Sequence, residues 1–172
     1  FTQNRVAAAP VRWCKGLVPS DRVQAIVINA GNANAATGEE GFRNAHRTAE
    51  IVGDRLGCGA EGVLVASTGV IGHQLPMERL EEGVHRAYQE LSGDATGFDN
   101  ASRAIMTTDT VPKIVSRRIP LDGGKFTIFG MAKGAAMIGP NMATMLGFLL
   151  TDARIAPGAL QGMLSEAVDD SF

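Results

Sequence analysis

Cysteine is scarce in this sequence of 172 residues, which contains only Cys14 and Cys58. Two cysteines are too few for a disulfide framework or for a cysteine-rich zinc cluster. Such low usage is typical of proteins in a reducing compartment, so we expect a cytoplasmic location. The first residue is Phe1, with neither an initiator methionine nor a charged leader, so no signal peptide is visible. We expect both ends to be trimmed from a longer chain.

Long runs of one kind of residue are also missing. No apolar run approaches the ~20 residues of a membrane-spanning helix, and the longest one is interrupted at Gly147. No basic block is longer than Arg117-Arg118, and the formal net charge is −2. The charge pattern therefore excludes the footprint of a nucleic-acid or anionic-membrane binder. We expect neither nucleic acid nor membrane as a partner.

The residues that are present suffice for one sizeable core, since 45% of them are hydrophobic and 20% are charged. Short apolar runs, typical of buried strands, are separated by segments with apolar residues at helical spacing. The pattern predicts a single layered α/β domain over residues 1–172. Residues 1–20 are expected to be extended, followed by a turn. We expect strands at 23–28, 63–66, 113–120, 125–133 and 145–150, and helices at 39–56, 76–91, 98–105 and 160–168.

One glycine motif is rejected as a cofactor site. Residues 57–62 match the G-x-G-x-x-G spacing of dinucleotide-binding loops. They follow a predicted helix and precede a predicted strand, whereas that mechanism needs a strand first, so that the pyrophosphate meets a helix N-terminus. We expect no dinucleotide here.

A Gly- and Met-rich segment, residues 133–146, leads into an apolar run and contains Thr144. A threonine hydroxyl is a poor nucleophile, but cutting the preceding peptide bond frees an α-amine that can act as its base. Gly139-Pro140 favours an irregular backbone, and the small Ala143 leaves room for attack on its carbonyl. These features would favour self-cleavage between Ala143 and Thr144. From spacing alone, however, Thr144 is more readily interpreted as a β-former at the start of a strand.

Three other stretches carry polar groups next to predicted elements. Residues 29–34 are rich in Asn and Gly, which tolerate left-handed backbone angles and present amide groups. Residues 67–72 contain Thr68-Gly69, where a hydroxyl and an unshielded backbone N–H can face a cleft. Residues 106–113 place several hydroxyls after a helix, where they commonly act as caps. By themselves these stretches are ordinary connections.

Together and in this order, the four stretches resemble the ornithine acetyltransferase family, the bifunctional glutamate N-acetyltransferases of arginine biosynthesis. The resemblance extends over the whole chain and implies the sheet-and-helix fold of that family. It implies that Thr144 is the catalytic nucleophile, freed by self-cleavage. It also implies that the Thr68 hydroxyl and the Gly69 N–H form the oxyanion hole.

The same resemblance implies substrate contacts at Thr107, Lys133 and Thr144. Thr107 is the match for a substrate-binding threonine, with its neighbour Thr108 as the open alternative. A lysine ammonium suits the carboxylate of an amino-acid substrate. From its position alone, Lys133 is also interpreted as a solvated strand end.

The reaction implied by the resemblance moves an acetyl group from N2-acetyl-L-ornithine to L-glutamate through an acetyl-threonine intermediate, without a metal or an organic cofactor. Acetyl-coenzyme A stays open as a second acetyl donor. Family members continue well beyond Phe172, so we expect a fragment whose missing C-terminal part supplies the β chain of an α2β2 heterotetramer. The alternatives are a self-processing N-terminal-nucleophile amidase or aminopeptidase, which would pass the acyl group to water, and a non-enzymatic binding domain.

Overall fold

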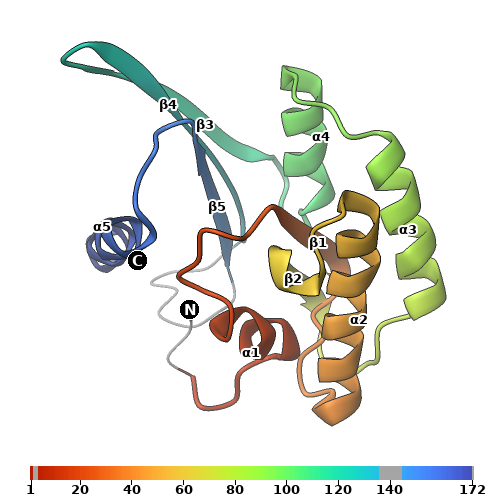
Figure 1. Ribbon diagram of the computed structural model, residues 1–172. Coiled ribbons are helices and arrows are strands. Elements are labelled where there is room, and N and C mark those ends of the chain that lie inside the picture. The colour runs from red at the N-terminus through yellow and green to blue at the C-terminus, as the bar shows by residue number, and fades with distance from the viewer. Residues whose placement is uncertain (2–3, 136–144, 172) are drawn as a thin grey trace.

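The computed structural model describes residues 1, 4–135 and 145–171. Two sheets organise this part of the chain, one of two parallel strands and one of three antiparallel strands. Helices cover the parallel pair, while the long antiparallel hairpin extends away from them (Figure 1). The mixed sheet-and-helix architecture confirms the predicted α/β class.

The parallel pair is a β–α–β unit made of β1 (Ala25–Asn32), α2 (Gly38–Leu56) and β2 (Val63–Val70). Parallel strands need a crossover, and α2 supplies it. The register runs from Ala25 opposite Val63 to Gly31 opposite Gly69. As a result, the carboxyl ends of both strands lie at the same edge of the sheet.

Helix α2 begins one residue before the predicted segment and ends at the predicted residue. Its apolar stripe packs on the sheet, and Ala49 forms a core cluster with Val63 and Val65 of β2. Gly57 ends the helix with a left-handed φ of 69°, and a short 3-10 turn, η1 (Ala60–Gly62), leads into β2. Residues 57–62 thus follow a helix and precede a strand. This confirms the order predicted from the sequence, which is the reverse of the order that a dinucleotide-binding loop needs.

The expectation of an extended segment at residues 1–20 is wrong, because α1 (Ala9–Lys15) forms there. Pro10 lies in the first helical turn, where its missing N–H costs nothing. The helix is held by tertiary contacts that the local pattern does not reveal. Trp13 Nε1 donates to the Val63 carbonyl at 3.1 Å, and Cys14 Sγ donates to the Val65 carbonyl at 3.2 Å. Helix α1 therefore packs along β2.

Strand β1 differs from its prediction in length and burial. It continues through Asn32, so four of the six residues of the predicted loop at residues 29–34 are strand. An apolar run of this kind is typical of a buried strand, but Ile26 is 40% exposed. The physical reason is that this sheet has two strands among the described residues, so less of its surface is covered than in a large parallel sheet.

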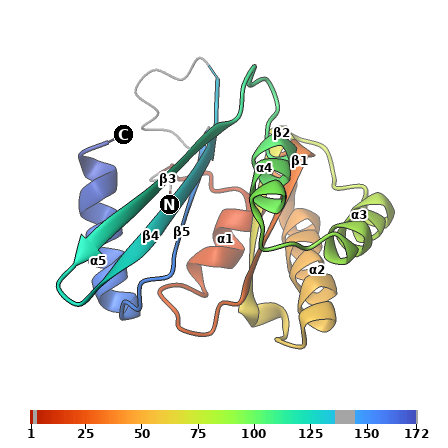
Figure 2. The same cartoon turned by 90° about the horizontal axis from the view of Figure 1, so that it is seen from above.

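Two further helices follow β2. Helix α3 (Met77–Gln89) starts directly after Pro76 and packs beside α2, with no buried residue among its side chains. Helix α4 (Ala95–Ala104) starts earlier than predicted, because Asp94 is its N-cap and accepts a hydrogen bond from the Gly97 amide at 2.8 Å. Helix α3 lies on the outer side of the unit, and α4 lies between α3 and the antiparallel sheet (Figure 2).

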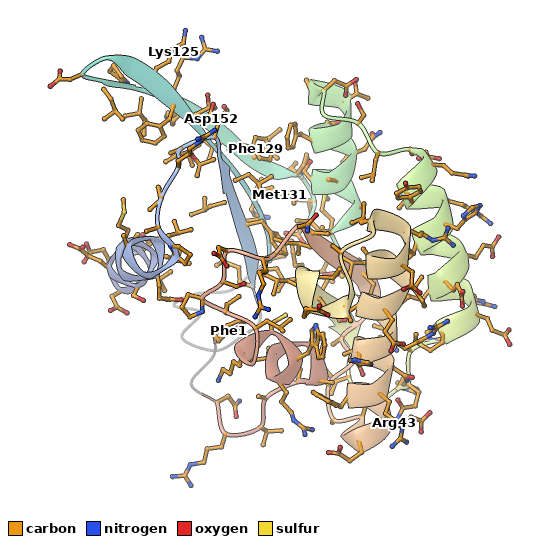
Figure 3. All side chains as sticks on the ribbon, viewed as in Figure 1. Phe1, Arg43, Lys125, Phe129, Met131 and Asp152 are labelled. Atoms are coloured by element: carbon orange, nitrogen blue, oxygen red, sulfur yellow. The ribbon has the colours of Figure 1, made fainter. Side chains whose placement is uncertain are left out.

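The antiparallel sheet has the order β3-β4-β5, with β3 (Lys113–Leu121), β4 (Gly124–Lys133) and β5 (Leu146–Thr151). The predicted hairpin is confirmed. Its turn has two residues, and Gly123 supplies the positive φ of 90°. Phe129 of β4 contacts Phe98 of α4 with ring centroids 4.6 Å apart, which joins this sheet to the helices (Figure 3).

The last helix, α5 (Pro157–Asp169), confirms the predicted C-terminal helix and stands apart from the rest of the molecule (Figure 1). None of its residues is buried. Among the described residues, no helix has the length and apolar content needed to cross a bilayer.

Candidate functional site

Three of the residues predicted for the site meet at one buried ammonium group. Lys133 Nζ donates to Thr68 Oγ1 at 3.0 Å and to Thr107 Oγ1 at 2.8 Å. Lys133 as a whole is only 4% exposed. The interpretation of Lys133 as a solvated strand end is therefore wrong, and Thr107 rather than Thr108 makes the contact with it. We call Thr68, Thr107 and Lys133 the lysine–threonine cluster.

Each member of the cluster comes from a different element. Thr68 belongs to β2, Thr107 follows α4, and Lys133 is the last residue of β4. Thr68 was expected just after a strand at residues 63–66, but β2 continues to Val70 and includes it. The cluster thus links the carboxyl end of the parallel pair to the end of β4, where Lys133 is paired with Leu146 of β5.

Gly69, the other predicted oxyanion donor, lies next to the cluster on β2 and is exposed. Its φ of 134° is one that side-chain-bearing residues rarely adopt. A Cβ added to Gly69 would lie 2.2 Å from the carbonyl carbon of Gly31, its partner on β1. The two strands approach so closely here that only glycine fits, which leaves the Gly69 backbone unshielded by a side chain.

Asp109, which the sequence interpretation did not single out, organises the backbone around the cluster. Its Oδ1 accepts from the Gly134 amide and from Lys113 Nζ, both at 2.7 Å. Its Oδ2 accepts a longer bond of 3.4 Å from the Thr107 amide. The carboxylate thereby connects Thr107 itself to the residue that follows Lys133. Its place in the Thr-Thr-Asp segment was the signal that could have identified it.

The Asp109 side chain has no exposed area. Burial alone would raise the pKa of this carboxyl, but the hydrogen bonds from Lys113, Gly134 and Thr107 outweigh it and lower the pKa to about 2. Asp109 is therefore ionised at neutral pH. A buried carboxylate of this kind fixes the amides that it accepts from.

The Asn-rich stretch uses its amide groups internally instead of presenting them to solvent. Asn34 is fully buried, with a positive φ of 46°; its Nδ2 donates to the Gly41 carbonyl at 2.9 Å, and its Oδ1 accepts from Thr37 Oγ1 at 2.8 Å. Asn29 Oδ1 accepts from Ser67 Oγ at 2.6 Å, directly before Thr68. The bond between Ser67 and Asn29 joins the carboxyl ends of β2 and β1.

Thr144, the predicted nucleophile, and Ala143 lie outside the described residues, as does Gly139-Pro140. The described chain resumes at Met145 and enters β5 at Leu146, opposite Lys133. Within residues 1, 4–135 and 145–171, no group of three or more His, Cys, Asp or Glu side chains is arranged to hold a metal ion. A shallow hollow lined by Val6, Ala7, Ala9, Arg12 and residues 36–38 shares no residue with the lysine–threonine cluster.

Solved structures of similar sequence share this fold. The ornithine acetyltransferase of Mycobacterium tuberculosis, crystallised with ornithine, is 45% identical with a TM-score of 0.76, over 81% of this chain and 74% of that one. The arginine biosynthesis bifunctional protein ArgJ of Bacillus halodurans is 36% identical with a TM-score of 0.73, over 83% of this chain and 74% of that one.

Curated relatives carry the same name. The arginine biosynthesis bifunctional protein ArgJ of Thermotoga neapolitana is 49% identical over 175 residues, which cover 100% of this chain and 43% of the relative. The protein of that name from Symbiobacterium thermophilum is 49% identical over 172 residues, covering 100% of this chain and 42% of the relative. The chain thus spans less than half the length of these relatives. The sequence model of the ArgJ family matches residues 1–172, the entire chain. The chain therefore belongs to the ArgJ family.

Proposed function

We propose that this chain is part of an enzyme that transfers the acetyl group of N2-acetyl-L-ornithine to L-glutamate in arginine biosynthesis. The observation that carries the proposal is the convergence of Thr68, Thr107 and Lys133 on one buried ammonium group. The similarity to an ornithine acetyltransferase crystallised with ornithine supports the substrate class. Lys133 and Thr107 would contact the amino-acid substrate, as would Thr144.

In the first half-reaction, Thr144 Oγ attacks the acetyl carbonyl carbon and forms a C–O bond. The proton of the hydroxyl moves to the free α-amine of Thr144 and from there to the departing nitrogen. The amide C–N bond breaks and ornithine leaves, so the acetyl group remains on Thr144 as an ester. The Thr68 hydroxyl and the Gly69 N–H donate to the oxyanion that develops in this step.

In the second half-reaction, the α-amine of glutamate attacks the acetyl ester carbon. A C–N bond forms, the C–O bond to Thr144 breaks, and the proton of the attacking amine returns to Thr144 Oγ. The same two donors stabilise the oxyanion again. Because both half-reactions use one site, acetyl-ornithine and glutamate bind in turn. Each presents its α-carboxylate to Lys133.

Thr144 can act in this way only if its α-amine is free. We infer that the chain is the part of a precursor that contains the cut between Ala143 and Thr144. Thr144 Oγ attacks the Ala143 carbonyl carbon, and the C–N bond to Thr144 breaks as an ester forms and the α-amine is freed. Water then hydrolyses that ester, which releases Ala143 as a carboxylate and restores the Thr144 hydroxyl. The β chain would then begin at Thr144, and the missing length of the relatives would supply the rest of it, in an α2β2 heterotetramer located in the cytoplasm. Acetyl-coenzyme A is proposed as a second acetyl donor.

N-terminal sequencing of the purified full-length protein tests the proposal directly. The expected result is two N-termini, one of them starting at Thr144. The variant Thr144→Ala should give one intact band on a denaturing gel and no detectable transfer, since cleavage and transfer use the same oxygen. Cleavage of the Ala variant at that bond would overturn the assignment of Thr144.

The rival function is a self-processing amidase that would share Thr144 and hand the acyl group to water. Incubating the processed protein with acetyl-ornithine, with and without glutamate, separates the two. An acetyltransferase releases ornithine much faster when glutamate is present and forms N-acetylglutamate in equal amount. An amidase releases free acetate at the same rate in both mixtures.

A further inference from the structure

The polarity of the hydrogen bonds in the lysine–threonine cluster is determined by chemistry. An ammonium group has three N–H donors and no acceptor. The bonds from Lys133 Nζ to Thr68 Oγ1 and Thr107 Oγ1 can therefore run in one direction only, with both hydroxyls accepting. The hydrogen of each hydroxyl is consequently left to point away from Lys133 and to donate to a third group.

The cluster has little freedom to rearrange. Lys133 is 4% exposed, so its ammonium is almost entirely removed from water. Among the residues that the structure describes, Nζ contacts no carboxylate, and both of its hydrogen-bond partners are hydroxyl oxygens. A buried charge that lost these partners would carry the full cost of desolvation. The two hydroxyls are therefore held as acceptors.

The backbone on either side of the ammonium is fixed as well. The Asp109 carboxylate accepts from the amides of Thr107 and Gly134, and Gly134 directly follows Lys133. Gly134 has a φ of 149°, which suits glycine and lets the chain leave β4 at this point. Thr107 and Lys133 are thus held together through main-chain atoms as well as through their side chains.

We propose that Lys133 is the positioning residue that orients the Thr68 hydroxyl as a hydrogen-bond donor to the oxyanion. This inference rests on the proposed function, in which Thr68 stabilises the tetrahedral intermediate. By occupying a lone pair of Thr68 Oγ1, the ammonium directs the hydroxyl hydrogen towards the reacting carbonyl and polarises the O–H bond. Lys133 therefore acts on the transition state, in addition to any contact with a substrate carboxylate.

The two roles of Lys133 predict different kinetics. A residue that only binds a substrate carboxylate contributes ground-state affinity, so its loss raises KM and leaves kcat almost unchanged. A residue that orients an oxyanion donor contributes mainly in the transition state, so its loss lowers kcat. The effect on kcat should also depend on Thr68 still having a hydroxyl to orient.

A double-mutant cycle on the processed full-length enzyme tests this dependence. We expect Thr68→Val and Lys133→Met each to lower kcat by roughly 100-fold, the size found for one oxyanion donor. The double variant should be within about threefold of the slower single variant, because both changes remove the same interaction. Independent effects, with the double variant slower by the product of the two, would overturn the proposal, as would a change in KM alone.

Lys125→Met is the matched control, because Lys125 lies on the same strand at the free end of the hairpin and is exposed (Figure 3). Its kcat and KM should equal those of the unmodified enzyme.

A spectroscopic measurement complements the cycle: the infrared carbonyl stretch of the acetyl-enzyme, labelled with 13C-acetyl. In Lys133→Met this stretch should move to the higher frequency seen in Thr68→Val. A stretch unchanged from that of the unmodified enzyme would contradict the proposal.

If Lys133→Met does not accumulate as folded, processed protein, Lys133→Gln takes its place in the same measurements. Gln keeps two N–H donors and can orient the Thr68 hydroxyl in part. A kcat of Lys133→Gln that lies between the values of the unmodified enzyme and of Thr68→Val therefore supports the proposal. Full kcat with a raised KM overturns it. Failure of the proposed function would look different, because the unmodified protein would then form no acetyl-enzyme and no N-acetylglutamate.

Discussion

Gly69 shows at the scale of one residue how closely β1 and β2 approach beside the lysine–threonine cluster. We predict that Gly69→Ala destabilises the full-length protein by more than about 3 kcal/mol, since a strained φ alone costs about 1–3 kcal/mol and the new methyl group meets the Gly31 backbone. The free energy of unfolding in urea measures this. Gly72→Ala is the control, because Gly72 also has a positive φ, of 86°, but has open space around its Cβ position. Equal losses in the two variants would contradict the importance of the close approach.

Asp109 is the second residue with a role that substitution can isolate. Asp109→Asn keeps the size of the side chain but turns an amide group towards N–H donors, so we expect a loss of stability on the order of 2 kcal/mol at neutral pH. Lys113→Met removes the ion pair but leaves the carboxylate and its amide bonds. Since the Lys113 side chain is 46% exposed, that variant should lose less than about 1 kcal/mol. Melting temperatures of both variants provide the comparison, and a larger loss in Lys113→Met would refute it.

At the scale of one element, α4 offers a test of local stability away from the reacting groups. Asp94 caps its N-terminus through the Gly97 amide, and this bond lowers the pKa of the exposed carboxyl. Asp94→Ala should lower the melting temperature of the protein, because the Gly97 amide loses the acceptor that caps the helix. Because the cap is at the opposite end of α4 from Thr107, kcat and KM should stay within about twofold of the values of the unmodified enzyme. A large fall in kcat would show that α4 transmits its position to the cluster.

The helices and strands also show where local patterns suffice. The hairpin of β3 and β4 is correctly predicted because Asp122-Gly123 supplies the positive φ that its two-residue turn needs. Helix α2 is correctly predicted because a long amphipathic stripe is a strong signal. Helix α1 was missed because it has seven residues, too few for a visible apolar stripe. It also contains Pro10, which is tolerated because it lies in the first turn.

For the whole molecule, Asp109 predicts how stability depends on acid. Its pKa is about 2 in the folded protein against an ordinary 3.8, so the unfolded chain binds this proton more readily. The stabilisation is therefore complete above about pH 4 and is lost as the pH falls through that value towards about 2. We expect the stability difference between the unmodified protein and Asp109→Asn, measured in urea from about pH 5 to 2, to shrink over that window. A difference that stays constant would show that Asp109 does not carry it.

The sequence by itself determined the α/β class, most of the helices and strands, and the order of the four stretches that resemble the family. These features are local, because a periodic pattern or a turn residue acts within a few positions along the chain. The roles of Thr68, Gly69, Thr107 and Lys133 in a site came from the resemblance. The local chemistry of its segment also pointed to Thr144, which the described residues do not include.

Only the tertiary structure decided how these candidates are arranged. The bonds of Lys133 to Thr107 and to Thr68 span 26 and 65 positions in the sequence, so no local pattern could indicate them. The burial of Lys133 and Asp109 depends on packing between separate elements, and so does the inward use of the Asn34 amide. The physical reason is that burial and hydrogen-bond direction depend on neighbours in space, which the chain acquires only when β2, β4 and the segment after α4 come together.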